Sequence, residues 1–106
     1  MKVTKVSFEN LSVGKNEVKI MPLHGDRNMG CAVFAPGARV PDQGLASHNE
    51  DEYAYFISGS LKCFSGGEFY EVKAGDATFI PAGEEHYAVN ESDEPCMLVY
   101  VLAKKS

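Results

Sequence analysis

Short runs of alternating polar and apolar residues follow one another along the chain, as from 18 to 21 and from 69 to 72. The runs are rich in β-branched and aromatic residues, which favour strands. Ten glycines and five prolines are spread between them and leave no interval for a long helix. The pattern predicts nine strands, near residues 3–8, 17–23, 30–35, 47–57, 60–65, 69–73, 77–80, 86–90 and 96–103.

The segments between these runs carry residues typical of tight turns. Ser58-Gly59-Ser60 and Ser65-Gly66-Gly67 are predicted to join antiparallel strands, and Gly75 in Lys73-Ala74-Gly75-Asp76 supplies a turn with positive φ. Nine short strands with regular turns in about a hundred residues are typical of a β-sandwich or a β-barrel. We therefore predict an all-β fold in one domain that spans residues 1–106.

Composition and charge narrow the classes of partner. The 106 residues include 15 Asp and Glu against 10 Lys and Arg, a formal net charge of -5. Such a chain would repel a phosphate backbone, so we expect no nucleic-acid partner. The longest apolar run, from Cys96 to Ala103, is far shorter than the roughly 20 residues that cross a bilayer, so we expect no membrane partner.

Cysteine usage and the first residues bear on the compartment. Cys31, Cys63 and Cys96 lie far apart, form no C-x-x-C pair, and are interpreted as buried free thiols. The segment 1–8 alternates polar and apolar residues and lacks the apolar centre of a secretory signal. These features predict a cytoplasmic protein.

One segment carries a specific spacing of glycine, proline, histidine and asparagine. From Gly75 to Asn90 the chain fits G-x5-P-x-G-x2-H-x3-N at all fixed positions, with His86 as the histidine. This segment resembles the second motif of the cupin superfamily. At roughly 5% per residue type, five such coincidences in one window are rare.

An upstream segment resembles the first cupin motif, G-x5-H-x-H-x3,4-E-x6-G. His48 stands at its second histidine, Glu52 at its glutamate and Gly59 at its closing glycine. Ala46 stands where the first histidine is expected, and the run from Gly37 to that position is longer than the usual spacing. Together the motifs cover about half of the chain.

The resemblance to small single-domain cupins of the cupin 2 type implies a jelly-roll barrel with a metal site at its mouth. His48 and Glu52 share parity and would face the same side of one strand, with His86 brought opposite by the turn. Two imidazoles and one carboxylate suit Fe(II), Mn(II), Ni(II) or Zn(II) and leave coordination positions free. Gln43 or Glu50 could add a ligand in place of the missing histidine, or could be solvated.

Neighbouring side chains offer further candidates with simpler explanations beside them. Arg39 could hold a substrate carboxylate, although a surface arginine is the simpler interpretation. Glu84 and Glu85 are expected in solvent at a hairpin tip, where they would act as acid or base only if buried. The aromatic residues of the motifs are expected to pack in the core or to line the pocket. No residue is assigned a catalytic role.

Two functions remain open at this point. The first is a mononuclear metal enzyme that acts on a small polar metabolite through dioxygenase, isomerase or lyase chemistry. The second is a non-catalytic small-molecule-binding or sensor cupin with a degenerate metal site, which Ala46 favours. The resemblance also implies a homodimer, formed through edge strands or exchanged N-terminal strands.

Overall fold

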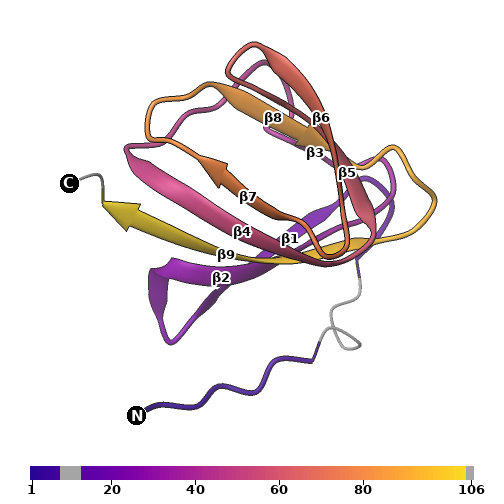
Figure 1. The fold of residues 1–106 in the computed structure, drawn as a ribbon. Coiled ribbons are helices and arrows are strands. Elements are labelled where there is room, and N and C mark those ends of the chain that lie inside the picture. The colour runs from indigo at the N-terminus through magenta and orange to yellow at the C-terminus, as the bar shows by residue number, and fades with distance from the viewer. Residues whose placement is uncertain (8–12, 105–106) are drawn as a thin grey trace.

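The computed structural model describes residues 1–7 and 13–104, and within that range every regular element is a β-strand (Figure 1). The strands are β1 (Val18–Leu23), β2 (Asp26–Phe34), β3 (Arg39–Val40), β4 (Glu50–Ser58), β5 (Ser60–Ser65), β6 (Glu68–Lys73), β7 (Ala77–Ile80), β8 (His86–Val89) and β9 (Cys96–Lys104). The all-β prediction is confirmed. The described part of the chain contains no helix that is long and apolar enough to span a membrane.

The strands form two antiparallel sheets that face each other (Figure 1). The five-stranded sheet has the order β1-β2-β9-β4-β7, and the four-stranded sheet has the order β3-β8-β5-β6. Consecutive strands repeatedly change sheet, so that β9 lies between β2 and β4 although it is last in the chain. This is the jelly-roll barrel that the resemblance to cupins implies.

The space between the sheets holds the hydrophobic core. Ala54 and Phe56 alternate on β4 with the exposed Tyr53 and Tyr55, as a strand with one buried face requires. Side chains from both sheets form one buried cluster: Ala32, Phe34, Ala38, Ala54, Phe56, Leu61, Val72, Cys96 and Leu98. The hydrophobic pattern thereby determines which face of each strand turns inward.

One predicted strand is absent, one observed strand was not predicted, and the bounds of others differ: β2 begins four residues before the predicted 30–35, and β4 begins three residues after the predicted start at 47. The strand near 3–8 is wrong for residues 3–7, which form no strand, and residue 8 lies outside the described residues. The alternation of polar and apolar residues is compatible with a strand, but residues 3–7 pair with no neighbouring strand. Val3 is accordingly 79% exposed. The prediction omitted β3, since two residues are too few to show a period.

Gly59 shows why the closing glycine of the first motif is needed. Its φ is +79°, a left-handed conformation that residues with a Cβ rarely adopt. A Cβ there would also lie 2.7 Å from Cys96 Cα and would collide with the carbonyl of Pro95. The β4–β5 turn therefore packs directly against the start of β9, and only glycine fits between them.

Asn90, the last fixed position of the second motif, is fully buried and joins three segments. Its side-chain amide donates to the carbonyl oxygens of Phe34 at 3.0 Å and Glu94 at 2.8 Å. Its side-chain oxygen accepts hydrogen bonds from the backbone N–H (2.9 Å) and the hydroxyl (2.7 Å) of Ser92. Every polar group of the side chain is thus paired in a site without water access, and the residue fixes the loop before β9.

We predict that Asn90→Ala lowers the free energy of unfolding by about 2–4 kcal/mol, because it leaves several buried polar groups unpaired at about 1–3 kcal/mol each. Urea denaturation measures the change. Asn49→Ala is the matched control at an exposed position and should change stability by less than about 0.5 kcal/mol. Equal stability of the two variants would contradict the structural role of Asn90.

Candidate functional site

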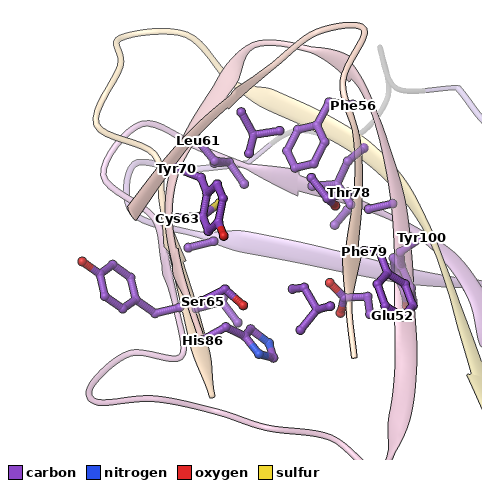
Figure 2. Close-up of a pocket in the computed structure, with 18 of the residues that line it drawn as sticks. Glu52, Phe56, Leu61, Cys63, Ser65, Tyr70, Thr78, Phe79, His86 and Tyr100 are labelled. Carbon is purple, nitrogen blue, oxygen red and sulfur yellow. The ribbon is translucent and has the colours of Figure 1, made fainter. Parts of the chain in front are cut away.

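Three potential metal ligands come together between the sheets. Glu52 lies on β4, His86 is the first residue of β8, and His48 precedes β4. One donor atom of each residue lies within 4.8 Å of the others, and the two imidazole centroids are 5.2 Å apart. Figure 2 shows Glu52 and His86 extending from opposite sheets toward one space. The structure therefore brings together the three residues that the motifs single out.

The position of His48 has a different cause from the one that the sequence suggested. The predicted strand 47–57 begins only at Glu50, so His48 and Glu52 do not lie on one strand and their shared parity does not explain their approach. Instead, Ala46 forms a bridge with His86: each backbone N–H donates to the other residue's carbonyl, at 3.0 and 2.9 Å. The carbonyl of His48 also accepts from the N–H of Gly83 at 2.8 Å. Backbone pairing with β8 and its preceding turn thus places His48.

The ring of His86 is oriented by a hydrogen bond from its far side. Nδ1 lies 2.8 Å from the carbonyl oxygen of Glu84. Since a carbonyl can only accept, Nδ1 carries the proton and Nε2 is left unprotonated in the neutral ring. A second partner of this kind is typical of metal-binding histidines, because it fixes both the tautomer and the ring orientation.

The three consecutive acidic residues at the start of β4 have different contacts. Glu50 pairs with Arg27 of β2 at 2.6 Å. Asp51 accepts a hydrogen bond of 2.8 Å from the backbone N–H of Ala82 and so ties the β7–β8 turn to β4. Glu50 is therefore not a further ligand in this arrangement, and Gln43 lies exposed on the loop after β3. Of the acidic run, Glu52 alone belongs to the group.

A cavity of about 500 Å³ opens beside these three residues (Figure 2). Its wall comes from both sheets and is mostly apolar, with Phe56, Leu61, Val72 and Leu98 among the lining residues. Its polar groups include Cys63, Ser65, Thr78, Glu84 and Tyr100. The site thus combines a small polar group of potential ligands with a larger apolar chamber.

Glu84 lines the cavity, although the sequence predicts it in solvent at a hairpin tip. It is half-buried, and its carboxylate accepts a hydrogen bond of 2.7 Å from the buried hydroxyl of Ser65. A Cβ on Gly66 would lie 2.8 Å from that carboxyl group, so glycine makes room for it. Glu84 precedes β8 and lies outside any strand, so strand alternation in the sequence could not have placed it in the site. Glu85 is exposed, as expected.

Tyr100 also lines the cavity, and its hydroxyl lies close to the backbone of β2. A Cβ on Gly30 would be 2.7 Å from the tyrosine Cζ, so a larger residue there would displace the ring. Burial raises the pKa of Tyr100, and the nearby Cys31 and Glu52 raise it further, whereas Arg27 lowers it. The phenol therefore stays protonated at neutral pH and is available as a hydrogen-bond donor.

Arg39 holds the loop after β3. Its guanidinium donates to the carbonyl oxygens of Pro41 at 2.7 Å and Gly44 at 3.1 Å, and lies 4.2 Å from the centre of the Tyr87 ring. It is not among the residues that line the cavity. These contacts favour the interpretation of Arg39 as a structural residue over a role in holding a substrate carboxylate.

All three cysteines are free thiols, as predicted, and two of them are buried. Cys63 is half-buried in the cavity wall. Burial, with a smaller effect of Glu52, raises the pKa of Cys63 to about 11. Burial and the neighbouring Cys63 raise the pKa of Cys96 to about 12. At neutral pH both thiols stay protonated, which excludes activated nucleophiles.

These features define a class: a jelly-roll barrel with a histidine and carboxylate group at one end of an internal cavity. The chain belongs to the cupin family, since the Cupin_2 family model, a cupin domain, matches residues 31–102. No curated protein sequence matches the chain significantly.

Three solved structures with the same fold illustrate the range of sequence identity and structural similarity to this chain. A Cupin 2 conserved barrel domain protein from Salinispora arenicola CNS-205 is 26% identical with a TM-score of 0.68, over 98% of this chain and 89% of that one. A predicted oxalate decarboxylase from Thermotoga maritima is 27% identical with a TM-score of 0.65, over 73% of this chain. The match spans only 65% of the Thermotoga chain. A protein of Ralstonia eutropha JMP134, provisionally named a mannose-6-phosphate isomerase, has a TM-score of 0.76 at 20% identity, over 96% and 100%.

We predict that Cys63 reacts slowly with iodoacetamide at pH 8, because its pKa of about 11 leaves only about one thiol in a thousand ionised. The rate should rise about ten-fold per pH unit as the thiolate fraction grows. Peptide mass spectrometry measures the modification of each cysteine, and Cys96 should react more slowly still. The denatured protein is the control, in which all three react alike. Rapid alkylation of Cys63 at pH 7 would contradict the described environment.

Proposed function

We propose that this cupin binds one divalent transition metal ion through His48, Glu52 and His86 and acts on a small molecule held in the adjoining cavity. The observation that carries the proposal is the approach of three donor atoms to within 4.8 Å at the end of that cavity. The donor chemistry fits Fe(II), Mn(II), Ni(II) or Zn(II), since imidazole and carboxylate suit each of these ions. His86, with its tautomer fixed by the Glu84 carbonyl, supports the same conclusion.

Ala46 leaves one side of the proposed ligand set open. It stands directly opposite His86 in the backbone bridge, and the side chains of such a pair lie on one face about 4.5–5.5 Å apart at Cβ. A methyl group there provides no donor and occupies little space. We place two oxygen atoms of a bound molecule on this side of the ligand set.

When bound, the ion would act as a Lewis acid toward those oxygen atoms. The chain's own side chains supply the rest. Glu84, held by Ser65, is a carboxylate at the cavity wall that can accept a proton, and the Tyr100 hydroxyl can donate a hydrogen bond. This set supports isomerase or lyase chemistry, in which a proton leaves a carbon beside a carbonyl; dioxygenase chemistry would need iron at the same ligands.

The related structures support small-molecule chemistry on this fold. Their names refer to oxalate and to mannose 6-phosphate, two small molecules that carry several oxygen atoms. At these levels of identity and coverage the likeness extends to the fold, and function has to be argued from the site. The reaction proposed for this chain therefore rests on its own residues.

A second candidate function is a non-catalytic binding or sensor protein with a degenerate metal site. The observation that favours it is Ala46, which removes the first histidine of the motif. In that case organic ligands would raise the melting temperature without any added metal. A stabilisation that requires both metal and ligand supports the metal-dependent function instead.

We predict about one metal ion per chain after reconstitution of protein purified without a polyhistidine tag. His48→Ala, His86→Ala and Glu52→Gln should each weaken metal affinity at least about ten-fold, since even partners outside the coordination shell change it by about 10- to 100-fold. Elemental analysis and competition with a coloured chelator measure occupancy and affinity. His24→Ala is the matched control, because His24 lies away from the group and contacts Thr4.

One further variant should increase the metal affinity measured by chelator competition. Ala46→His places an imidazole opposite His86 and should strengthen metal binding about ten-fold or more. Ser47→His, at the adjacent exposed position, is its control and should have no such effect. Near-zero metal in the wild-type protein after reconstitution would overturn the proposed function.

We further propose that the chain is a single cupin domain of the cytoplasm that pairs as a homodimer. Three free thiols support a reducing compartment. A row of exposed apolar residues crosses four strands of the five-stranded sheet: Met29, Val101, Tyr53 and Phe79 are cross-strand neighbours and are 41–52% exposed. Such rows are typical of surfaces that a partner covers. Since residues 3–7 form no strand, this sheet face supports pairing better than exchanged N-terminal strands.

We predict that light scattering at micromolar concentration gives about twice the 11.5 kDa of one chain. Tyr53→Lys should shift the mass toward one chain, because a buried ammonium without a partner is unfavourable at an apolar interface. Lys62→Ala, on the other sheet, should leave the mass unchanged. A wild-type monomer would contradict the homodimer.

A further inference from the structure

The inner end of the cavity is made of the same side chains as the hydrophobic core. Phe56, Leu61, Val72 and Leu98 line it and are only 2–7% exposed. A chamber with such walls does not hold water well, and empty apolar cavities in proteins readily take apolar ligands. Its volume of about 500 Å³ falls within the roughly 300–1,000 Å³ of ligand pockets. The inner end is therefore suited to an apolar group.

Cationic side chains are missing from the wall. Among the described residues that line the cavity there is no lysine or arginine, while two carboxylates, Glu52 and Glu84, belong to it. Both arginines are engaged elsewhere: Arg39 contacts the loop after β3, and Arg27 pairs with Glu50. Lys62 and Lys73 pair with Glu71. A phosphate or a second carboxylate in the chamber would lose its hydration and gain no counter-charge from the chain.

We propose that the natural ligand is amphipathic: two adjacent oxygen atoms at one end and an uncharged apolar body of about 8–12 carbon atoms at the other. The oxygen end lies at His48, Glu52 and His86, and the apolar body lies against the inner wall. The oxygen end rests on the proposed function, because it requires the metal ion. The apolar end stands on the chamber alone. Sugar phosphates and dicarboxylates are excluded as preferred ligands.

The oxygen end of the proposed ligand is tested with hydroxamic acids, which present two oxygen atoms to a metal. Acetohydroxamic, hexanohydroxamic and decanohydroxamic acid share that head and differ only in tail length. Calorimetry on the zinc-loaded protein should show affinity that rises up to about four-fold for each buried methylene, the factor expected for full transfer from water. Equal affinities along the series, or displacement of decanohydroxamic acid by micromolar glucose 6-phosphate or oxalate, would overturn the proposal.

The apolar end is tested without metal. Straight-chain alcohols from butanol to decanol should stabilise the metal-free protein increasingly with length. If the protein takes up no metal but the alcohols follow this trend, the proposed function fails and the apolar chamber stands. If it takes up metal but neither series depends on tail length, the proposed function stands and the ligand class fails.

A cavity-filling variant locates the effect. Ala32→Leu adds volume at a buried lining residue of β2, away from the three ligand residues, and should reduce the affinity ratio of the decyl to the acetyl compound at least five-fold while metal affinity is unchanged. Ala103→Leu is the matched control outside the cavity and should retain the ratio. If Ala32→Leu does not fold, Val72→Phe fills the chamber from the other sheet. If a folded cavity-filling variant kept the wild-type ratio of decyl to acetyl affinity, the placement of the tail in the cavity would be wrong.

Discussion

The pair of backbone hydrogen bonds between Ala46 and His86 is the constraint on which the site depends. It closes the irregular segment after β3 onto the start of β8, and it brings His48 to His86 without any strand shared by the two residues. Glu52 then enters from the opposite sheet, whose separation from β8 is set by the apolar side chains packed between the sheets. The ligand geometry therefore follows from backbone pairing and core packing.

The acidic character of the chain is organised around this site. Three carboxylates near the ligand group have defined partners: Glu50 has Arg27, Asp51 has the N–H of Ala82, and Glu84 has Ser65. These pairings orient the neighbours of Glu52 and prevent them from competing for the same position. The net charge of -5 still favours the approach of a divalent cation to the mouth.

The sequence predicts more of the fold than of the site. Alternating side chains and turn residues identify eight of the nine strands, because hydrophobic burial repeats along each strand. They fail where structure depends on a partner: residues 3–7 have the pattern but no neighbouring strand, and β3 has a neighbour but too few residues to show a pattern. The motif residues His48, Glu52 and His86 do meet. Glu84 and Tyr100 could not be found in this way, since their positions depend on close approaches at Gly66 and Gly30.

The loss of the first histidine and the apolar cavity point in the same direction. Ala46 removes a nitrogen donor from the ligand set, and the described residues of the cavity wall include no lysine or arginine to pair with an anion. A chamber of this size lowers stability while it is empty, because its lining side chains lack contacts on one side. A molecule with an oxygen pair and an apolar body would supply the missing donor atoms and also the missing packing contacts. The missing histidine at Ala46 and the apolar cavity are thus best explained together, because both provide space for one ligand.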